Sequence, residues 1–274
     1  MTFLFRFKHL GFLGTLIVLV LFNCFGCAEI NHLREAQKAF SDTSAMENSL
    51  HLSTIDIKGV NINDTAQTEV LVRAGYASVL TSLDNINKTQ QDKLKSDQLW
   101  GVVASLKAMT YWRLDQDAKA MAQAKDALDN FNDQLGPRDR AILTAIPGLI
   151  RNDQAFRGLK KIPGDSGEAI IQSPKKLLIN AMPHISKARA KLSADHPMHT
   201  YLIQSQLIIY ANLNEACNKL ESSQISKCQE SVVKEKCVAQ TAMNDLKRLA
   251  WVSHKGLVDK WEQWTNLVPG QPCQ

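Results

Sequence analysis

The stretch "SDQLWGVVASLKAMTYWRLDQDAKAMAQAKDALDNF", residues 96–131, decides the fold. Leu99, Val103 and Leu106 recur at spacings of four and three residues, which is the period of one face of an α-helix. After a break at "LDQD", a second helical pattern places four more residues on one face: Met121, Ala124, Leu128 and Phe131. Two amphipathic helices joined by a few residues pack antiparallel, so the stretch predicts a helical hairpin.

Small and aromatic residues stand at characteristic places in this hairpin. They are Ala108 and Tyr111 in the first helix, and Ala120 and Ala127 in the second. In these positions the stretch from about 101 to 134 resembles the tetratricopeptide repeat, a helix–turn–helix unit of about 34 residues. The pattern differs at Ala104, Ala124 and Asn132, and it does not recur one repeat further along, so a single unit is identified. The resemblance implies an α-solenoid-like stack of helical hairpins.

The rest of the chain also follows helical patterns, so we expect an all-α fold of antiparallel helical hairpins. Residues 41–64, rich in Ser, Thr and Asn, predict a loop. A helix is expected over about 65–87, with these residues as its buried stripe: Val70, Ala74, Ala77, Leu80 and Leu83. Pro147-Gly148 predicts a kink or break in a later helix. The "KKIPGDSGEA" stretch, 160–169, predicts a linker between an N-terminal region, 27–159, and a C-terminal region, 170–274.

Proline marks two expected helix starts in the C-terminal region. Ser173-Pro174 has the pattern of an N-cap followed by proline at the first helical position, and Pro197 opens the next helix. The four cysteines of this region are Cys217, Cys228, Cys237 and Cys273. An even number in an oxidising compartment favours two disulfides. If residues 222–227 form a hairpin turn, the expected pairs are Cys217–Cys237 and Cys228–Cys273. The other connectivities stay open, and zinc is a less suitable use because the cysteines lack close C-x₂₋₄-C spacing.

The N-terminus has the pattern of a signal peptide, residues 1–26. Arg6 and Lys8 precede the uncharged run Leu10–Phe22, which is too short for the roughly 20 residues that span a bilayer. Gly26 and Cys27 then resemble a bacterial lipobox, which implies that Cys27 carries the lipid as the first mature residue and can be labelled with palmitate. Ala28 after it implies sorting to the periplasmic face of the outer membrane. A plain membrane anchor and ordinary signal cleavage are the alternatives to a lipobox. A redox pair in "CFGC" lacks the strand that precedes such a motif.

Composition and motifs narrow the classes of function. The net charge of +5 is spread along the chain, so we expect no nucleic-acid partner. The "GDSG" in the linker resembles a serine-protease motif but lies in an all-α chain, and we expect no enzyme, no cofactor and no metal. His184, His196 and His199 could bind a transition metal, although surface and capping roles fit them better. A pair of buried ionisable side chains converging in a cleft would instead indicate an enzyme of cell-wall metabolism.

The aromatic residues are the remaining candidates for a binding site. Trp261 and Trp264 share one face of an expected C-terminal helix, and Trp100, Tyr111 and Trp112 lie in the hairpin. Packing in the core is one role for them, and anchoring a protein partner is the other. The sequence therefore predicts a lipid-anchored periplasmic scaffold or adaptor that presents a helical surface to a protein partner in the cell envelope. The alternative is an accessory ligand-binding lipoprotein of a solute transport system.

Overall fold

The computed structural model describes residues 28–55, 62–249, 255–267 and 273, and within them the chain is all-α, as predicted. The signal segment and Cys27 lie outside these ranges, so both remain predictions. None of the described helices combines the length and the apolar character that a bilayer crossing requires. The chain divides into two compact units, one ending at Ile146 and the other beginning at Pro147.

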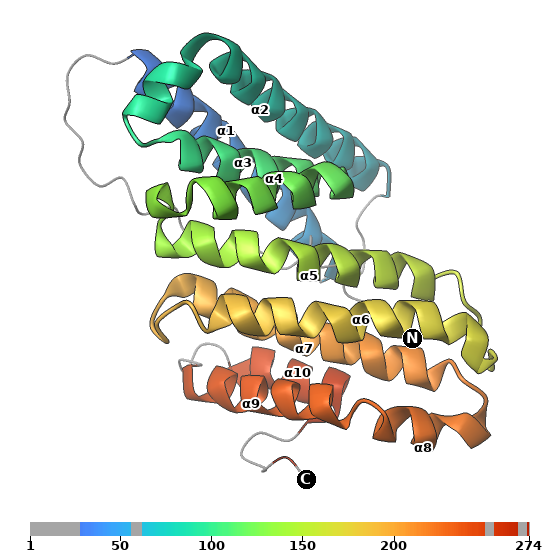
Figure 1. Cartoon of the computed structure of the whole chain (residues 1–274). Coiled ribbons are helices and arrows are strands. Elements are labelled where there is room, and N and C mark those ends of the chain that lie inside the picture. The colour runs from blue at the N-terminus through green and yellow to red at the C-terminus, as the bar shows by residue number, and fades with distance from the viewer. Residues whose placement is uncertain (1–27, 56–61, 250–254, 268–272, 274) are drawn as a thin grey trace. The chain divides into compact units, whose positions relative to one another are not determined.

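In the N-terminal unit, helices α1 (Ala28–Ile55) and α2 (Ile62–Ser96) form a long antiparallel pair, and α3 (Trp100–Arg113) packs against α2 (Figure 1). The loop predicted over 41–64 is wrong, because α1 continues to Ile55. Thr43, Ser44 and Glu47 are buried in this second half of α1. Polar residues fill the seam there, so the apolar period that announces a helix is missing.

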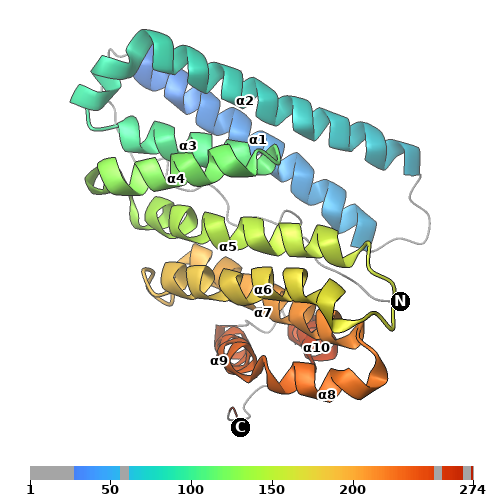
Figure 2. The ribbon, with the colours of Figure 1, turned by 45° about the vertical axis from the view of Figure 1, so that its right-hand side comes forward.

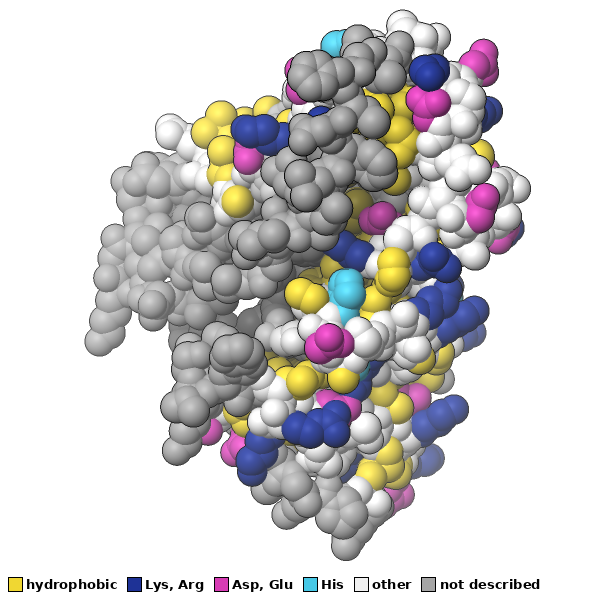
Figure 3. Space-filling view, turned by 90° about the vertical axis from the view of Figure 1, so that its left-hand side faces the viewer, with side chains coloured by type: hydrophobic (Ala, Val, Ile, Leu, Met, Phe, Trp, Pro, Cys, Tyr) yellow, Lys and Arg dark blue, Asp and Glu magenta, His cyan; other side chains and the backbone are white. Residues whose placement is uncertain are grey.

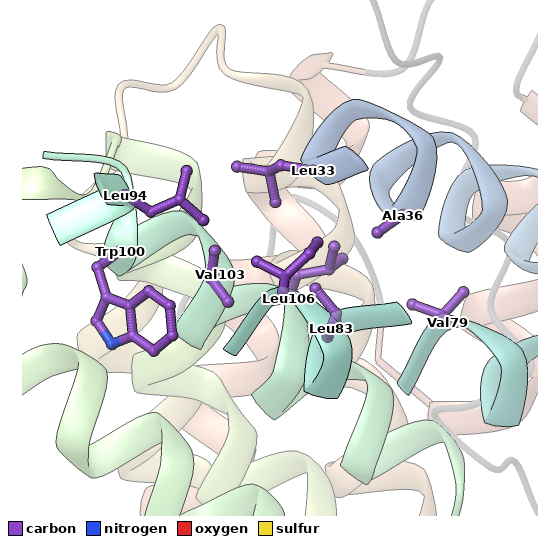
Figure 4. Packing of buried hydrophobic residues seen from close by; sticks show 9 residues of the cluster. Leu33, Ala36, Val79, Leu83, Leu94, Trp100, Val103 and Leu106 are labelled. Atoms are coloured by element: carbon purple, nitrogen blue, oxygen red, sulfur yellow. The ribbon is translucent and has the colours of Figure 1, made fainter. Parts of the chain in front are cut away.

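The core of this unit lies where α1, α2 and α3 meet (Figure 4). Leu33 and Ala36 come from α1, and Val103 and Leu106 come from α3. Between them, α2 contributes side chains that are almost fully buried: Val79, Leu83, Ile86 and Leu94. Burial of such side chains stabilises the unit by about 1.5–3 kcal/mol each, which holds α2 firmly by one face.

The predicted hairpin of residues 96–131 is confirmed. Helix α4 (Asp117–Asn130) packs antiparallel to α3, and the small residues expected at their contact are fully buried: Ala108, Ala120, Ala124 and Ala127. Asp115 takes a left-handed conformation, with φ of 60°, and makes the tight turn between the helices. A short 3₁₀ turn, η2 (Asn132–Gln134), follows, and the Gln134 side chain accepts a 2.9 Å hydrogen bond from the Gly101 backbone N–H at the start of α3.

Helix α5 (Pro137–Leu159) is continuous through Pro147. The predicted break at Pro147-Gly148 is therefore wrong. Leu143, Ile146, Leu149 and Ile150 are all fully buried, and their packing outweighs the one backbone hydrogen bond that proline removes. Gly148 is required by close packing, since a Cβ there would lie 2.7 Å from the Ala181 carbonyl oxygen.

The C-terminal unit is built around α7 (Pro197–Asn218), which carries buried residues on all sides. Helix α6 (Glu168–Arg189) forms an antiparallel hairpin with α7, and both α9 (Val233–Leu249) and α10 (Lys255–Thr265) pack on α7 (Figure 2). The predicted start at Pro197 is confirmed. The start predicted at Ser173-Pro174 is wrong, because α6 already begins at Glu168 and contains Pro174.

The predicted linker connects α5 and α6 and is fastened to the end of α7. Lys219 Nζ donates a 2.7 Å hydrogen bond to the Ile162 carbonyl, and the Ser166 N–H donates a 2.8 Å bond to the Lys219 carbonyl. These contacts hold residues 160–167 inside the C-terminal unit. The division between the compact units therefore lies earlier than the linker, within α5.

Both disulfides form in the C-terminal unit, but the predicted pairing is wrong. Cys217 pairs with Cys228, with Cα atoms 5.5 Å apart, and Cys237 pairs with Cys273 at 5.2 Å. The reason is a short helix, α8 (Ser222–Glu230), which occupies the residues expected to form a simple turn. Because α8 folds back on the end of α7, Cys228 meets Cys217, and Cys237 is left to hold the C-terminal tail.

Candidate functional site

Three of the five aromatic residues considered as partner anchors are core residues. Trp112 and Trp261 are each 1% exposed, and Trp100 is also buried. A side chain without accessible surface cannot anchor a partner, so these three are corrected to packing roles. Tyr111 and Trp264 are half-buried: Lys119 lies over the ring of Tyr111, and Trp264 packs edge-on against Trp261. Only these two retain surface for a partner.

A different surface, on α2, has the features of a binding site. We call it the α2 outer face, and its residues recur at helical intervals and are all exposed: Gln67, Val70, Leu71, Ala74, Ala77, Ser78, Thr81 and Ser82. None of them is charged. Val70 is 67% exposed and Leu71 is 59% exposed, although both are large apolar side chains. Contiguous exposed apolar residues mark interaction sites more often than single scattered ones do.

The α2 outer face contains part of the stripe that the sequence predicts to be buried. The real buried face of α2 is offset from it and has spacings of four, three, four and three residues: Val72, Tyr76, Val79, Leu83 and Ile86. Helix α2 therefore has two apolar stripes, and the one with the larger side chains packs inward. The predicted stripe is wrong in register, because Val70, Ala74 and Ala77 also fit a helical period.

Two charged residues of α2, Arg73 and Asp84, form ion pairs on the side that meets α3. Lys107 of α3 donates a 2.8 Å hydrogen bond to Asp84, and Arg73 lies 3.6 Å from Asp115 in the α3–α4 turn. These ion pairs leave the α2 outer face on the side of the helix away from α3. An uncharged helix face exposed to solvent is suited to contact another helix, because no charge must be desolvated when the two meet.

Met46 of α1 is a further exposed apolar side chain of this unit. A Cβ built on Gly75 would lie 2.6 Å from Thr43 Oγ1, so α1 and α2 approach very closely at this level. Because the helices are antiparallel, Met46, one turn after Thr43, lies at the level of Leu71, one turn before Gly75. Met46 is 43% exposed. An exposed apolar side chain of α1 thus lies at the same level as Leu71 of the α2 outer face.

Behind this surface lies a buried polar cluster that joins α1, α2 and α3. The Tyr76 hydroxyl donates a 2.7 Å hydrogen bond to Glu47, and it accepts one of 3.0 Å from Ser44. Arg113 Nη1 lies 3.3 Å from the same Glu47 carboxylate, and its guanidinium stacks on Trp112. Breaking a buried pair of this kind leaves a charge without a partner and costs about 3–5 kcal/mol.

The protonation states of this cluster suit a structural role. Burial raises the pKa of Tyr76, Glu47 raises it further, and the positive charge of Arg113 and the bond from Ser44 act in the opposite direction. The phenol therefore keeps its proton and acts as a donor to Glu47. Glu47 and Arg113 are buried ionisable side chains that converge, but they are bonded to each other. We assign them to fixing the register of the three helices.

The three histidines of α6 and α7 occupy distinct positions. His196 is the N-cap of α7, where Nδ1 accepts a 3.1 Å hydrogen bond from the Met198 N–H, which fulfils the predicted capping role. His199 is buried rather than on the surface, and both of its ring nitrogens make hydrogen bonds. Burial and the nearby Arg151 and Lys187 lower the pKa of His184, which is half-buried.

Comparison with protein-family models, with curated proteins and with solved structures finds no match to this chain. Among the described residues, a binding role is assigned to the α2 outer face. A signal for it is present in the sequence, because two offset apolar stripes on one helix cannot both face the same neighbour.

Proposed function

We propose that the chain is a lipid-anchored scaffold or adaptor of the cell envelope, and that it binds a helix of a partner protein through the α2 outer face. The observation that carries the proposal is the uncharged surface with Val70 and Leu71 more than half exposed. A partner helix with an apolar face would cover it, in the way that helices are bound in apolar grooves. The proposal assigns no catalytic step to the chain.

Two further observations support the location. The four cysteines of the C-terminal region are paired in disulfides, which form and persist in oxidising compartments such as the periplasm. Helix α1 begins at Ala28, next to the expected lipid-bearing Cys27, so only one peptide bond would separate the lipid from the first helix. Multiple acyl chains make such attachment effectively stable. The periplasmic face of the outer membrane is the proposed site.

The test of the partner surface is site-specific photocrosslinking of the full chain in its own membrane. A photoreactive amino acid at Val70 or Leu71 should give one adduct of the same mass, and Leu71→Asp should remove the adduct formed from position 70. The matched control position is Ala122, which is exposed on α4. The identified partner, once purified, should bind the purified chain and not the Leu71→Asp variant. Equal adducts from positions 70 and 122, or none from 70 and 71, would rule out this surface.

The test of the anchor is independent of the partner. Cys27→Ala should abolish palmitate labelling and release the protein from membranes, with Cys24→Ala as the matched control that changes neither. Palmitate labelling that persists in the Cys27→Ala variant would contradict the anchor. The ligand-binding alternative is addressed by native mass spectrometry of the purified protein, where a bound small molecule of constant mass would favour it over the adaptor.

A further inference from the structure

Arg189, the last residue of α6, joins three helices of the C-terminal unit through one guanidinium group. Its Nε donates a 2.7 Å hydrogen bond to His199 Nε2 on α7, and its Nη1 donates a 2.9 Å bond to Gln206 Oε1 on the same helix. Its Nη2 donates to the Asp245 carboxylate on α9. On the face drawn in Figure 3, Lys and Arg side chains of the described residues lie interspersed with Asp and Glu side chains.

The bond between Arg189 and His199 fixes the protonation state of the histidine. A guanidinium is always charged and has only donors, so His199 Nε2 must accept and must carry no proton. The proton of the neutral ring is therefore on Nδ1, which donates a 3.0 Å hydrogen bond to the Ser193 carbonyl. The contact requires a neutral imidazole in the Nδ1–H tautomer.

Protonation of His199 would remove the acceptor that Arg189 uses. The Nε2–H of His199 would then face the Nε–H of Arg189, two donors with no acceptor between them. A second positive charge would also be buried beside the Arg189 guanidinium. Among the residues that the structure describes, the charged groups that face the ring are Arg189 from α6 and both Asp245 and Arg248 from α9. Asp245 already forms ion pairs with Arg189 and Arg248. Its single negative charge is therefore shared by two cations before His199 becomes a third.

We infer that the Arg189–His199 contact is a pH-sensitive clamp, which holds α9 against the α6–α7 hairpin at neutral pH and releases it in acid. When His199 takes up a proton, Arg189 loses its position between α7 and Asp245. Asp245 is the connection from this cluster to α9, so the C-terminal end of α9 loosens first. The inference does not depend on the proposed function, because it concerns only the C-terminal unit.

The environment of His199 sets the direction of the response. Burial is the largest effect and lowers the pKa of His199 below 6.5, as do the charges of Arg189 and Arg248, whereas the Ser193 carbonyl and Asp245 raise it. A histidine whose pKa is lowered by folding contributes stability that is complete above its unfolded value. That stability is lost as the pH falls from about 6.5 through the folded pKa.

The first test is NMR of the full chain labelled with ¹⁵N-histidine, which reports the tautomer and the pKa of each ring. His199 should show the Nδ1–H tautomer at pH 7.5 and titrate below 6.5, the ordinary value. An Nε2–H tautomer, or a titration at or above 6.5, would overturn the clamp. This measurement needs no substitution, so it stands even if a variant at position 199 fails to fold.

The second test is hydrogen exchange of the full chain, with rates corrected for intrinsic pH dependence. Between the unfolded and folded pKa values, protection of α9 should fall by up to about tenfold per pH unit, while protection of α3 should not change with it. His199→Gln supplies an acceptor that does not titrate and should remove the pH response of α9. His184→Gln is the matched control and should keep it. Equal responses of α9 in the wild-type chain and in His199→Gln would refute the inference.

Discussion

Substitution of Gly75 by alanine should destabilise the N-terminal unit, although alanine is the better helix former. In an exposed helix interior, alanine in place of glycine adds about 1 kcal/mol of stability. Here the new Cβ would lie 2.6 Å from Thr43 Oγ1 and 2.9 Å from Thr43 Cγ2. Overpacking of this kind costs about 1–3 kcal/mol. If overpacking costs about 2 kcal/mol and the better helix propensity of alanine returns about 1 kcal/mol, the free energy of unfolding should fall by about 1 kcal/mol.

The effect should depend on Thr43, and a double-mutant cycle measures that dependence. Thr43→Ala alone removes packing atoms and the 2.8 Å bond from its hydroxyl to the Ala39 carbonyl, and should cost about 1 kcal/mol. In Gly75→Ala combined with Thr43→Ala, the new Cβ fills the vacated space. The double variant should be close to the wild-type chain, which gives a coupling energy of about 2 kcal/mol.

The assay is urea unfolding of the purified chain with its disulfides intact, followed by far-UV circular dichroism. Gly158→Ala in α5 is the matched control, because a Cβ there would lie at an ordinary 3.4 Å from the Pro174 ring and should raise stability. If Gly75→Ala alone raises stability as Gly158→Ala does, and shows no coupling to Thr43, then α1 and α2 do not meet in this register. The placement of Met46 at the level of Leu71 would then also be wrong.

Two further predictions concern the interior of the units. Arg113→Met should lower the free energy of unfolding in urea by about 3–5 kcal/mol, since it removes the positive charge paired with the buried Glu47 carboxylate. Adding Glu47→Gln should recover most of the loss, and no recovery would contradict the ion pair. Cys237→Ser opens a disulfide that spans 36 residues to Cys273 and should lower stability by up to about 4 kcal/mol. Peptide mapping that links either cysteine to another partner would contradict the pairing.

The sequence predicts the fold well wherever apolar spacing and tight packing coincide. The α3–α4 hairpin is recognisable because alanines such as Ala108 and Ala120 stand at the contact, where small residues let the two helices approach closely. The second half of α1 is not recognisable, because its seam is built from Ser44 and Glu47 and is completed by Tyr76 from α2. Polar contacts between distant parts of the chain leave no periodic signal.

The candidate site and the disulfide pairing could not be predicted from local sequence patterns, for two different reasons. On α2, two apolar stripes compete, and the choice between them depends on how α1 and α3 approach, which no local pattern contains. In the C-terminal unit, the short helix α8 replaces a turn and brings Cys228 to Cys217, so a count of residues from an assumed turn gives the wrong pairs. The tryptophans were ambiguous because a large aromatic side chain suits both a core and an interface.

The fastening of residues 160–167 to the end of α7 has a mechanical consequence. In the proposed setting, force from the membrane enters the chain at its N-terminus and reaches the C-terminal unit along α5, a continuous helix. The load then passes through the connection after α5, where Lys219 holds Ile162 and Ser166 by two hydrogen bonds. Cys217, two residues before Lys219 at the end of α7, is covalently joined to α8. The segment 160–167, which receives the tension, is thus fastened to a disulfide-bonded part of the unit. A pull on the anchor would be resisted at this segment before α6 could separate from α7.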